Sequence, residues 1–405
     1  MRYKIDDIVT LIMDYRGKTP KKLGMDWTEN SRDILAISAK NIKNGRLINK
    51  DKAHYGDENL YKKWMKDGDI KVGDILMTSE APLGESYLIT KPLKAILSQR
   101  TFLIRLNKEL ADPWFFYSLI QSPMFKMKLL AKATGTTVIG IKQKELRKII
   151  VDLPSLNIQK KIGYYFKVID QKIRLNNQIN DNLISQLKII SNGYFSYFEA
   201  YNGKIPLDWS YIKLVDIANI DAGYSYTSKE LVDSNIAMAT IKNFDRTGGF
   251  NIRGFKEIKP NKIVKKEKYA KLFDILVAHT DLTQNADIIG NAEPILNTSK
   301  YSKIIYSMDL VKVTPKAEKI SPFLLALLLQ GDRLKKHCLG YVNGTTVLHL
   351  SKKALKEFEF PFPTSFSDLD NIAKFAERNY KLISNNMKEN QKLQNLKQVL
   401  LSKYF

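Results

Sequence analysis

The sequence predicts a tandem repeat of the α/β or α+β class, in which two globular units are each followed by a long helix. Three observations predict this fold. A segment of about twenty residues occurs twice, beginning at Ala133 and at Val342. Smaller matches precede both copies in the same order. A stretch with apolar residues at helical spacing follows each copy, and 405 residues suffice for two or three ordinary domains.

The repeated segment reads ATGTTVIGIKQKELRKIIVDLP in the first copy and VNGTTVLHLSKKALKEFEFPFP in the second. The run 135–138 matches 344–347, and Pro154 matches Pro363 without a gap. Shorter matches upstream keep the same order: Asp7 with Asp216, Lys40-Asn41 with Lys242-Asn243, Asp74-Ile75 with Asp274-Ile275, Ser98 with Ser307, and Pro113 with Pro322. Self-similarity of this kind is the signature of a repeat architecture.

The globular units span about 1–152 and 205–361. Strand-like runs (DILMTSE, TFLIRL, FDILVAH) alternate in them with helical ones, which is typical of α/β or α+β domains. Gly203 and Pro206 mark the restart of the chain between the two copies.

Each unit is followed by one long amphipathic stretch, within 153–204 and 362–405. The apolar stripes have steps of three and four residues: Ile162, Phe166, Ile169, Ile173, Leu183, Leu187, Ile190 and Tyr194 in the first, and Ile372, Ala376, Ile383, Leu393, Leu396, Leu400 and Tyr404 in the second. A helix of roughly forty residues is about 60 Å long. That exceeds an ordinary core helix, so a partner helix is expected.

Two asparagines interrupt each stripe near its middle: Asn176 and Asn180 in the first, Asn386 and Asn390 in the second. Buried asparagine lowers stability but fixes register in coiled coils. An antiparallel pairing would set Asn176 against Asn390 and Asn180 against Asn386. A parallel pairing would also align like with like, although the returning chain favours the antiparallel one. The alternative is that these asparagines are surface residues on a frayed stripe.

Composition favours a polyanionic partner. Lys and Arg number 65 against 42 acidic residues, a net charge of +23, which suits nucleic acid. A lysine bias of the genome would account for part of this excess. The single cysteine, Cys338, indicates a reducing compartment. The start of the chain has no signal-peptide run, and the longest apolar run, 323–329, is too short to cross a bilayer. We expect a cytoplasmic protein without membrane contact.

No catalytic site and no metal site are predicted. The run 16–19 (RGKT) resembles the end of a phosphate-binding loop, but the position that needs the first glycine is Ile12, and Pro20 follows at once. No glycine-rich nucleotide fingerprint and no Asn-Pro-Pro-aromatic stretch is present. Acid-x-Lys triplets such as 69–71 and 257–259 are expected by chance in a lysine-rich chain. The four histidines show no zinc-ligand spacing: His54, His279, His337 and His349.

The loops near the repeat anchors are rich in groups that contact DNA. Hydroxyls and lysines suit phosphates, whereas Asn, Gln, Arg and His can read base edges. A solvated polar loop is the alternative at each position. The predicted DNA contacts in the first copy are Tyr15, Arg16, Lys18, Thr19, Lys40, Asn41, Ser79, Arg100, Thr136, Thr137, Lys142 and Lys144. Those in the second copy are Tyr224, Ser225, Tyr226, Lys242, Asn243, His279, Thr280, Thr345, Thr346, His349, Lys352 and Lys353.

The segment LPSLNIQKKIGYYFKVIDQKIRLNNQIN, from Leu153, resembles the conserved helical region of specificity subunits of type I restriction–modification systems. In that family a Leu-Pro-x-Leu-x-x-Gln stretch opens a long helix that contains Leu-Asn-Asn. The Gly73-Asp-Ile-Leu run, the Gly-Thr-Thr motif and the two-copy layout over the whole chain agree with it. The second copy departs from the pattern, because the run from Phe362 to Phe366 lacks the counterpart of Gln159.

The resemblance implies two target-recognition domains, at 1–152 and 205–361, and two conserved helical regions, at 153–204 and 362–405. The helices would be antiparallel and the layout pseudo-twofold symmetric. Each domain would read one half of a split double-stranded DNA target. Two methyltransferase subunits, with S-adenosylmethionine, would dock on the helices, and two restriction subunits would add ATP- and Mg-dependent cleavage. This subunit would itself be non-catalytic and hold no cofactor.

Three alternatives remain. A stand-alone nuclease or methylase would be active as the purified chain alone. A coiled-coil scaffold would bind partners without protecting DNA selectively. A specificity module of a type IIB-like system would differ only in its partners.

Overall fold

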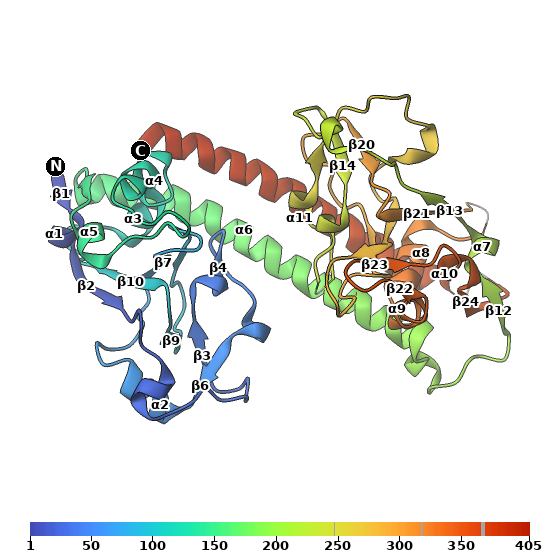
Figure 1. Cartoon of the computed structure of the whole chain (residues 1–405), viewed down its shortest axis with the longest axis horizontal. Helices are drawn as coiled ribbons and strands as arrows, with labels where there is room; N and C mark the ends of the chain where they lie inside the picture. Colours follow the sequence, from blue (N-terminus) through green and yellow to red (C-terminus); the bar gives the residue numbers. More distant parts are fainter. Residues whose placement is uncertain (247, 317–318, 366–368) are drawn as a thin grey trace. The chain divides into compact units, whose positions relative to one another are not determined.

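The computed structural model describes residues 1–246, 248–316, 319–365 and 369–405. The chain forms two compact units, 1–172 with 393–405, and 173–392. Each unit holds one copy of the repeat and part of both long helices, α6 (Leu156–Ser191) and α11 (Asp370–Tyr404). Figure 1 shows these helices in green and red. The tandem α/β repeat with two long helices is therefore confirmed; Phe366, the end of the run that departs from the pattern, lies outside the described residues.

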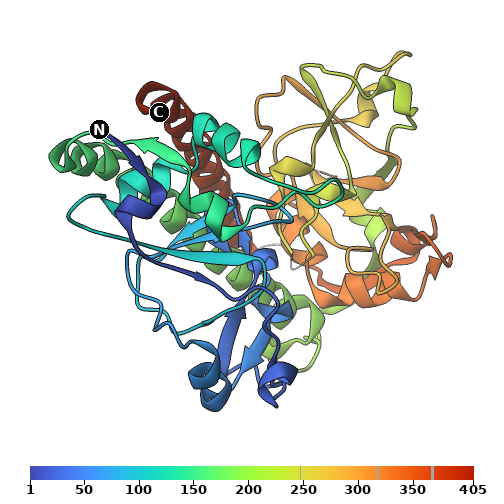
Figure 2. The same cartoon turned by 60° about the vertical axis from the view of Figure 1, so that its left-hand side comes forward.

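The first copy is built on a four-stranded antiparallel sheet in the order β2-β10-β7-β8. Its strands are β2 (Val9–Asp14), β10 (Thr101–Leu106), β7 (Ile75–Thr78) and β8 (Ser86–Leu88). Beside it lies a smaller sheet of β6 (His54–Gly56), β3 (Ile34–Ile37) and β9 (Ile96–Leu97), in which β3 and β9 are parallel. Figure 2 shows the strands of this copy in blue and cyan.

The second copy repeats this topology. Its main sheet is antiparallel, with the strands β13 (Ala218–Ala222), β21 (Leu310–Pro315), β17 (Ile275–Ala278) and β19 (Ala292–Pro294) in that order. Its smaller sheet has the order β15 (Lys256–Glu257), β14 (Ile236–Ala239), β20 (Lys303–Tyr306) and β16 (Tyr269–Ala270), and β14 and β20 are again parallel. The three strand-like runs predicted from the sequence form strands β7, β10 and β17 in the structure.

The remaining elements also recur. A short antiparallel pair joins the two ends of each copy: β1 (Arg2–Lys4) with β11 (Ile150–Asp152), and β12 (Trp209–Lys213) with β24 (Glu359–Pro363). The corresponding helices are α1 (Ile5–Ile8) and α7 (Leu214–Ile217), α3 (Pro113–Leu119) and α8 (Pro322–Leu329), α4 (Pro123–Ala131) and α9 (Asp332–Leu339), and α5 (Gln143–Arg147) and α10 (Ala354–Glu357). Helix α2 (Glu58–Trp64) belongs to the first copy, as do strands β4 (Ile42–Lys43) and β5 (Arg46–Leu47). The second copy adds a small sheet of β18 (Thr280–Asp281), β23 (Leu348–Leu350) and β22 (Val342–Asn343).

Helices α3 and α8 show how local sequence sets these elements. Each begins with a proline at its first position, where the missing N–H costs nothing. The preceding residue, Asp112 or Ser321, accepts a hydrogen bond from the N–H three residues on. Nearly all of the apolar side chains that follow are buried, so these helices form the centre of each core.

Each core also takes in part of both long helices. Ile162 and Phe166 of α6 and Leu401 of α11 join the core of the first unit. Leu187 of α6 and Tyr380 of α11 join that of the second. The helices are therefore held by tertiary packing at both ends, which long isolated helices lack.

The expected apolar stripe differs from the structure at one position. Leu396 is 47% exposed, and its neighbour Lys397 takes the buried place with only 12% of its side chain exposed. Hydrophobic spacing does not select lysine as a seam residue, although a buried lysine is tolerated once its charge is paired.

Candidate nucleic-acid interface

The two long helices pair through their asparagines in the second unit. Asn176 Nδ2 donates to Asn390 Oδ1 at 3.0 Å, and Asn386 Nδ2 donates to Asn180 Oδ1 at 2.8 Å. All four side chains are buried. These two contacts run in opposite directions along the helices, so α6 and α11 are antiparallel here. Of the two directions that the spacing left open, the structure contains the antiparallel one.

The first unit contains an ionic contact between the same helices. Lys397 Nζ lies 2.7 Å from Asp170 Oδ1 and 2.8 Å from Gln121 Oε1. The side chains of Lys397 and Asp170 are only 12% and 10% exposed. A buried charge is tolerated when it is paired and hydrogen-bonded, so this contact sets the helix register in the first unit.

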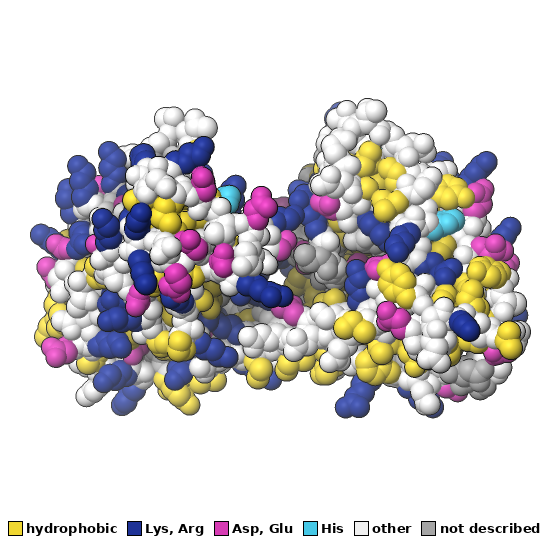
Figure 3. Space-filling model, turned by 90° about the horizontal axis from the view of Figure 1, so that it is seen from below, with side chains coloured by type: hydrophobic (Ala, Val, Ile, Leu, Met, Phe, Trp, Pro, Cys, Tyr) yellow, Lys and Arg dark blue, Asp and Glu magenta, His cyan; other side chains and the backbone are white. Residues whose placement is uncertain are grey.

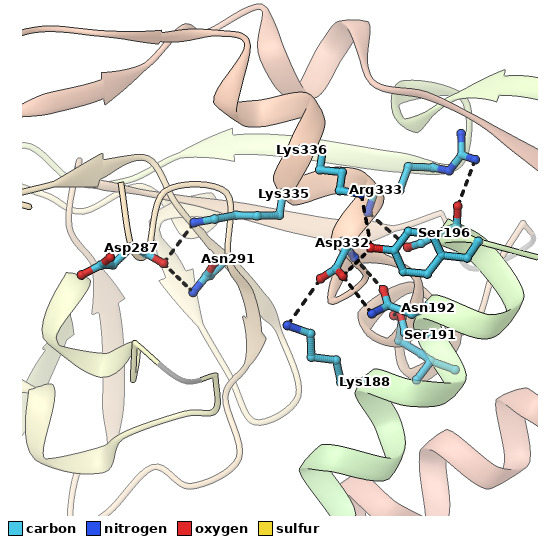
Figure 4. Close-up of polar contacts among 12 residues, drawn as sticks. Lys188, Ser191, Asn192, Ser196, Asp287, Asn291, Asp332, Arg333, Lys335 and Lys336 are labelled. Carbon is cyan, nitrogen blue, oxygen red and sulfur yellow. Dashed lines mark hydrogen bonds and ion pairs between the residues drawn. The ribbon is translucent and has the colours of Figure 1, made fainter. Parts of the chain in front are cut away.

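The end of α6 is joined to α9 by a polar cluster, drawn in Figure 4. The Asp332 carboxylate accepts from Asn192 Nδ2 at 3.1 Å and from Tyr197 OH at 2.8 Å, and it pairs with Lys188 at 3.4 Å. Burial, the largest single effect, raises the pKa of Asp332, but the contacts with Tyr197, Lys188 and Asn192 together outweigh it and hold this pKa below its ordinary value. Arg333 Nε donates to the Phe195 carbonyl at 2.8 Å. The cluster orients the second globular copy on its helix.

Glu293 is a buried acidic residue of the second unit. Glu293 accepts from the Gly249 N–H at 2.7 Å and from Gln330 Nε2 at 2.8 Å. Tyr380 of α11 donates to Gln330 Oε1, which extends the network to the long helix. Burial raises the pKa of Glu293 to about 7, since desolvation outweighs the two hydrogen bonds.

In the first copy, the Gly-Thr-Thr hairpin packs where two strands of the main sheet end. Ser79 directly follows β7, and its N–H donates to the carbonyl of Arg100, which directly precedes β10, at 2.9 Å. The Ile141 N–H donates to the Ser79 carbonyl, also at 2.9 Å. Gly140 bridges both Thr134 and Glu80. We call this meeting point of residues 79–80, 100 and 140–141 the first corner.

The second copy builds the same corner from residues 279–280, 309 and 349–350. The His279 N–H donates to the Asp309 carbonyl at 2.8 Å, and the Leu350 N–H donates to the His279 carbonyl at 2.8 Å. His349 pairs with both Asn343 and Thr280. We call this the second corner. The backbone contacts are the same in both copies, whereas the side chains differ.

Glycine begins both hairpins for a steric reason. Gly135 has φ of +112° and Gly344 has φ of +106°, a region that other residues rarely adopt. A Cβ at Gly135 would lie 2.1 Å from the Val138 carbonyl oxygen, and one at Gly344 would lie 2.2 Å from that of Val347. The motif is therefore repeated because both copies need the same turn.

The predicted tyrosine-bearing loops are partly structural. Tyr15 is buried and its hydroxyl accepts from the Asp67 N–H at 3.3 Å. Tyr224, its counterpart, donates to Glu230 at 2.6 Å, and this contact contributes most to lowering the pKa of Glu230 to about 2. Lys18 donates to the Trp64 carbonyl at 2.6 Å, and burial lowers its pKa.

The repeated Lys-Asn pairs divide into an exposed and a buried member. Lys40 and Lys242 are exposed. Asn41 is buried, and its amide donates to the carbonyls of Ile48 and Asn49, both at 3.2 Å. Asn243 is also buried and donates to the Asn251 carbonyl at 2.7 Å. These asparagines hold the loop that presents the neighbouring lysine.

The predicted DNA contacts fall into three groups by exposure. Six are buried: Tyr15, Asn41, Ser79, Tyr224, Asn243 and Thr280. Five are half-buried: Arg16, Lys18, Thr19, Tyr226 and His279. Thirteen are exposed: Lys40, Arg100, Thr136, Thr137, Lys142, Lys144, Ser225, Lys242, Thr345, Thr346, His349, Lys352 and Lys353. Nine of the thirteen exposed residues lie in or next to the two hairpins, at 136–144 and 345–353.

Two acidic residues at the corners were missed by sequence reasoning. Glu80 pairs with Arg100 at 2.7 Å, and Asp309 holds the position that corresponds to Arg100. A basic chain favours basic and hydroxyl side chains as DNA contacts, so composition does not select acidic residues. The signal in the sequence that could have identified them is their position next to the strand-like runs that are repeated in both copies.

Figure 3 shows one face of the molecule, on which Lys and Arg side chains are interspersed with acidic and apolar ones. Among the residues that the structure describes, no three His, Cys, Asp or Glu side chains group as a metal ion would require. Cys338 is buried, and desolvation raises its pKa to about 12. No described helix combines the length and the apolar character needed to span a membrane.

The duplicated fold, the antiparallel helices and the matched corners define a two-copy recognition protein. The chain belongs to the family of type I restriction modification DNA specificity domains, whose family model matches residues 1–184 and 206–395. Specificity subunits of type I systems recognise DNA and are non-catalytic, and this chain is accordingly a DNA-recognition subunit rather than an enzyme.

Individual relatives carry the same description. The type I restriction enzyme MjaVIII specificity subunit of Methanocaldococcus jannaschii is 24% identical over 71% of this chain and 68% of its own length. The MjaIX specificity subunit of the same organism is 23% identical over 56% of this chain and 54% of its own length. The crystal structure of the S subunit of a type I restriction-modification system from M. genitalium superposes with a TM-score of 0.55 at 17% identity, covering 100% of this chain and 96% of that one. This last likeness concerns the fold.

Proposed function

We propose that this chain reads a bipartite DNA target, one half with residues 1–152 and the other with residues 205–361. The observation that carries the proposal is the pair of corners. Their backbone hydrogen bonds match one for one, while the exposed side chains around them differ. A kept frame with changed side chains suits two domains that bind DNA in the same way and read different bases.

The segments 153–204 and 362–405 set the distance between the half-sites. Each helix has 35 or 36 residues, and their register is held by the buried asparagines and by the Lys397–Asp170 pair. Two domains on a rigid spacer can engage half-sites about one DNA turn, roughly 34–36 Å, apart. Because the second engagement is then intramolecular, affinity and selectivity rise together.

The helices also dock the methyltransferase subunits. A second apolar stripe on α6 has heptad steps and faces solvent: Ile158, Tyr165, Val168 and Leu175, each between 46% and 52% exposed. On α11, Phe375, Leu382 and Leu396 follow steps of seven and fourteen residues and are 37–47% exposed. Apolar residues at heptad spacing are the pattern by which one helix packs on another. The stripe thus suits helices of a partner subunit.

In this proposal the chain binds double-stranded DNA in the cytoplasm, together with two methyltransferase and two restriction subunits. The methyltransferases use S-adenosylmethionine to modify adenine, and the restriction subunits use ATP and Mg. The chain itself holds no cofactor.

The test is co-expression of this chain with a type I methyltransferase subunit, followed by mapping of methylated adenines. We expect one split motif with two unlike halves. Methylation at an uninterrupted motif, or nuclease or methylase activity of the chain alone, would contradict the proposal. A split motif in a system that cleaves on both sides of its target would instead favour the type IIB-like alternative.

A further inference from the structure

The two corners contain side chains whose chemistry points to base reading rather than to phosphate binding. In the first corner, Glu80 Oε1 lies 2.7 Å from Arg100 Nε. Their side chains are 26% and 50% exposed, so both reach the surface. A carboxylate repels phosphates, which makes Glu80 unsuited to contact with the DNA backbone. Paired with arginine, however, it can enter a groove without a net charge.

Arg100 is also held in an unusual backbone conformation. Its φ is +64°, in the left-handed region, which costs roughly 1–2 kcal/mol for a residue other than glycine. The corresponding residue of the second copy, Asp309, is not in this region. Strain of this kind persists where the surrounding structure enforces it, and it occurs often at functional sites. Here the Ser79 N–H donates to the Arg100 carbonyl, and the Arg100 side chain pairs with Glu80.

The second corner offers different groups in the same places. His349 is exposed, and its Nδ1 lies 3.3 Å from Thr280 Oγ1. Among the described residues His349 Nε2 has no hydrogen bond, so it is available to a ligand. Asp309 occupies the backbone position of Arg100, and its carboxylate accepts from Ser307 Oγ at 3.4 Å.

The residue at position 140 or 349 faces the residue at position 80 or 280, and the two differ together between the copies. A Cβ at Gly140 would lie 3.0 Å from Glu80 Cβ and 3.2 Å from the Ser79 carbonyl. The long Glu80 side chain therefore occurs opposite glycine, whereas the short Thr280 occurs opposite His349. The residues at the corner form a sterically matched set, not three independent surface positions.

We propose that each corner is one base-reading position. In the first copy it consists of Glu80 and Arg100, with Gly140 leaving room for Glu80. In the second it consists of Asp309 and His349, with the buried Thr280 contacting His349. This inference rests on the proposed function and adds the base pair that is read. The guanidinium of Arg100 donates to O6 and N7 of guanine, and the Glu80 carboxylate accepts from N4 of the paired cytosine. The first half-site therefore contains a G·C pair at this position. The second corner has no arginine and reads a different pair.

The experiment compares methylated motifs of the intact complex carrying variants of this chain. Arg100→Ala and Glu80→Gln each relax one position of the first half-site, with about a 10- to 100-fold loss of preference for G·C. The second half-site and the spacer do not change. His349→Gly relaxes one position of the second half-site only. Glu58→Gln, which removes the exposed Lys94–Glu58 pair of the first copy, serves as the matched control and leaves the motif unchanged.

A transplant gives an independent test. The concerted variant Glu80→Thr, Arg100→Asp, Gly140→His changes the preferred base pair at that position of the first half-site toward the pair read by the second corner. If a variant complex does not methylate, binding of the purified complex to duplexes with each of the four base pairs at that position gives the same readout.

The outcomes separate the two claims. A split wild-type motif whose first half keeps every base preference in Arg100→Ala and Glu80→Gln would overturn the base-reading corner and leave the proposed function standing. A wild-type motif without two halves would overturn both. Equal weakening of binding to all four duplexes would make residues 80 and 100 backbone contacts, which also contradicts the inference.

Discussion

Asn176 Nδ2 donates to Asn390 Oδ1 at 3.0 Å, and this contact sets α6 and α11 antiparallel in the second unit. Asn176 Nδ2 also lies 2.7 Å from Glu389 Oε2, and Asn390 Nδ2 donates to Asn177 Oδ1 at 3.1 Å. A shift of one helix by a turn would bury these amides against apolar side chains. Polar pairing at the seam thus selects one register, at some cost in stability.

The neighbouring pair provides a clean test of the seam. Asn180→Ala leaves the Asn386 amide buried without its partner and should lower the free energy of unfolding by about 1–3 kcal/mol. Replacing both residues by leucine should restore most of that loss, because the pair is then apolar. Urea unfolding followed by circular dichroism measures both effects. Gln178→Leu, on the exposed side of α6, is the control and should be nearly neutral. Equal losses in the single and double variants would refute this role.

The buried ion pair of the first unit should depend strongly on both partners. Lys397→Met leaves Asp170 as an uncompensated buried charge, which costs about 3–5 kcal/mol. The double variant Lys397→Met, Asp170→Leu should recover most of this. Lys94→Met, which breaks an exposed pair in the same unit, should cost less than about 1 kcal/mol. Unfolding curves of the variants measure both losses. Equal losses for Lys397→Met and Lys94→Met would show that burial does not make the Lys397–Asp170 pair more important.

Glu293 should make the stability of the second unit depend on pH. Its pKa of about 7 in the folded state lies above the ordinary value near 4.3. The unfolded chain therefore loses this proton first as pH rises. The stability from the protonated form is complete below about pH 4 and is lost as pH rises to about 7. Glu293→Gln should flatten this part of the profile, as measured by thermal unfolding from pH 4 to 8. If Glu293→Gln has the same dependence of stability on pH as the wild type, the raised pKa of Glu293 would be contradicted.

The hairpin glycines should tolerate no side chain. In Gly135→Ala the new Cβ would meet the Val138 carbonyl oxygen at 2.1 Å, so the turn must open, with strain of roughly 1–3 kcal/mol. We expect weaker DNA binding by the complex with little change in global unfolding. Gly68→Ala has a similar φ of +108° but no atom within 4 Å of the new Cβ, and it isolates the steric effect. DNA binding by both variants is compared by fluorescence anisotropy.

Helix length should determine the spacer of the target. Adding seven residues to both helices next to the paired asparagines lengthens each by about 10 Å, or about three base pairs of DNA. Mapping of methylated motifs should show a longer spacer and unchanged half-sites. An unchanged spacer would show that the helices do not measure this distance.

By itself the sequence determined the features that repeat or recur at short range. The tandem copies follow from matched segments about 200 residues apart, and the long helices follow from steps of three and four residues. Helical spacing, a local property, predicts that the asparagines lie on the apolar stripes. The spacing leaves both helix directions open, and the return of the chain favours the antiparallel one.

Only the tertiary structure decided which polar residues face outward. Asn41 and Asn243 resemble base-reading residues in the sequence, yet their amides are buried against backbone carbonyls. Lys397 and not Leu396 lies in the helix seam, because the Asp170 carboxylate lies there and forms an ion pair with it. The corners bring together residues far apart in the sequence through backbone hydrogen bonds: Ser79 bonds Arg100, 21 positions on, and Ile141, 62 positions on. Such contacts depend on strand register and hairpin packing, which no local pattern of residues encodes.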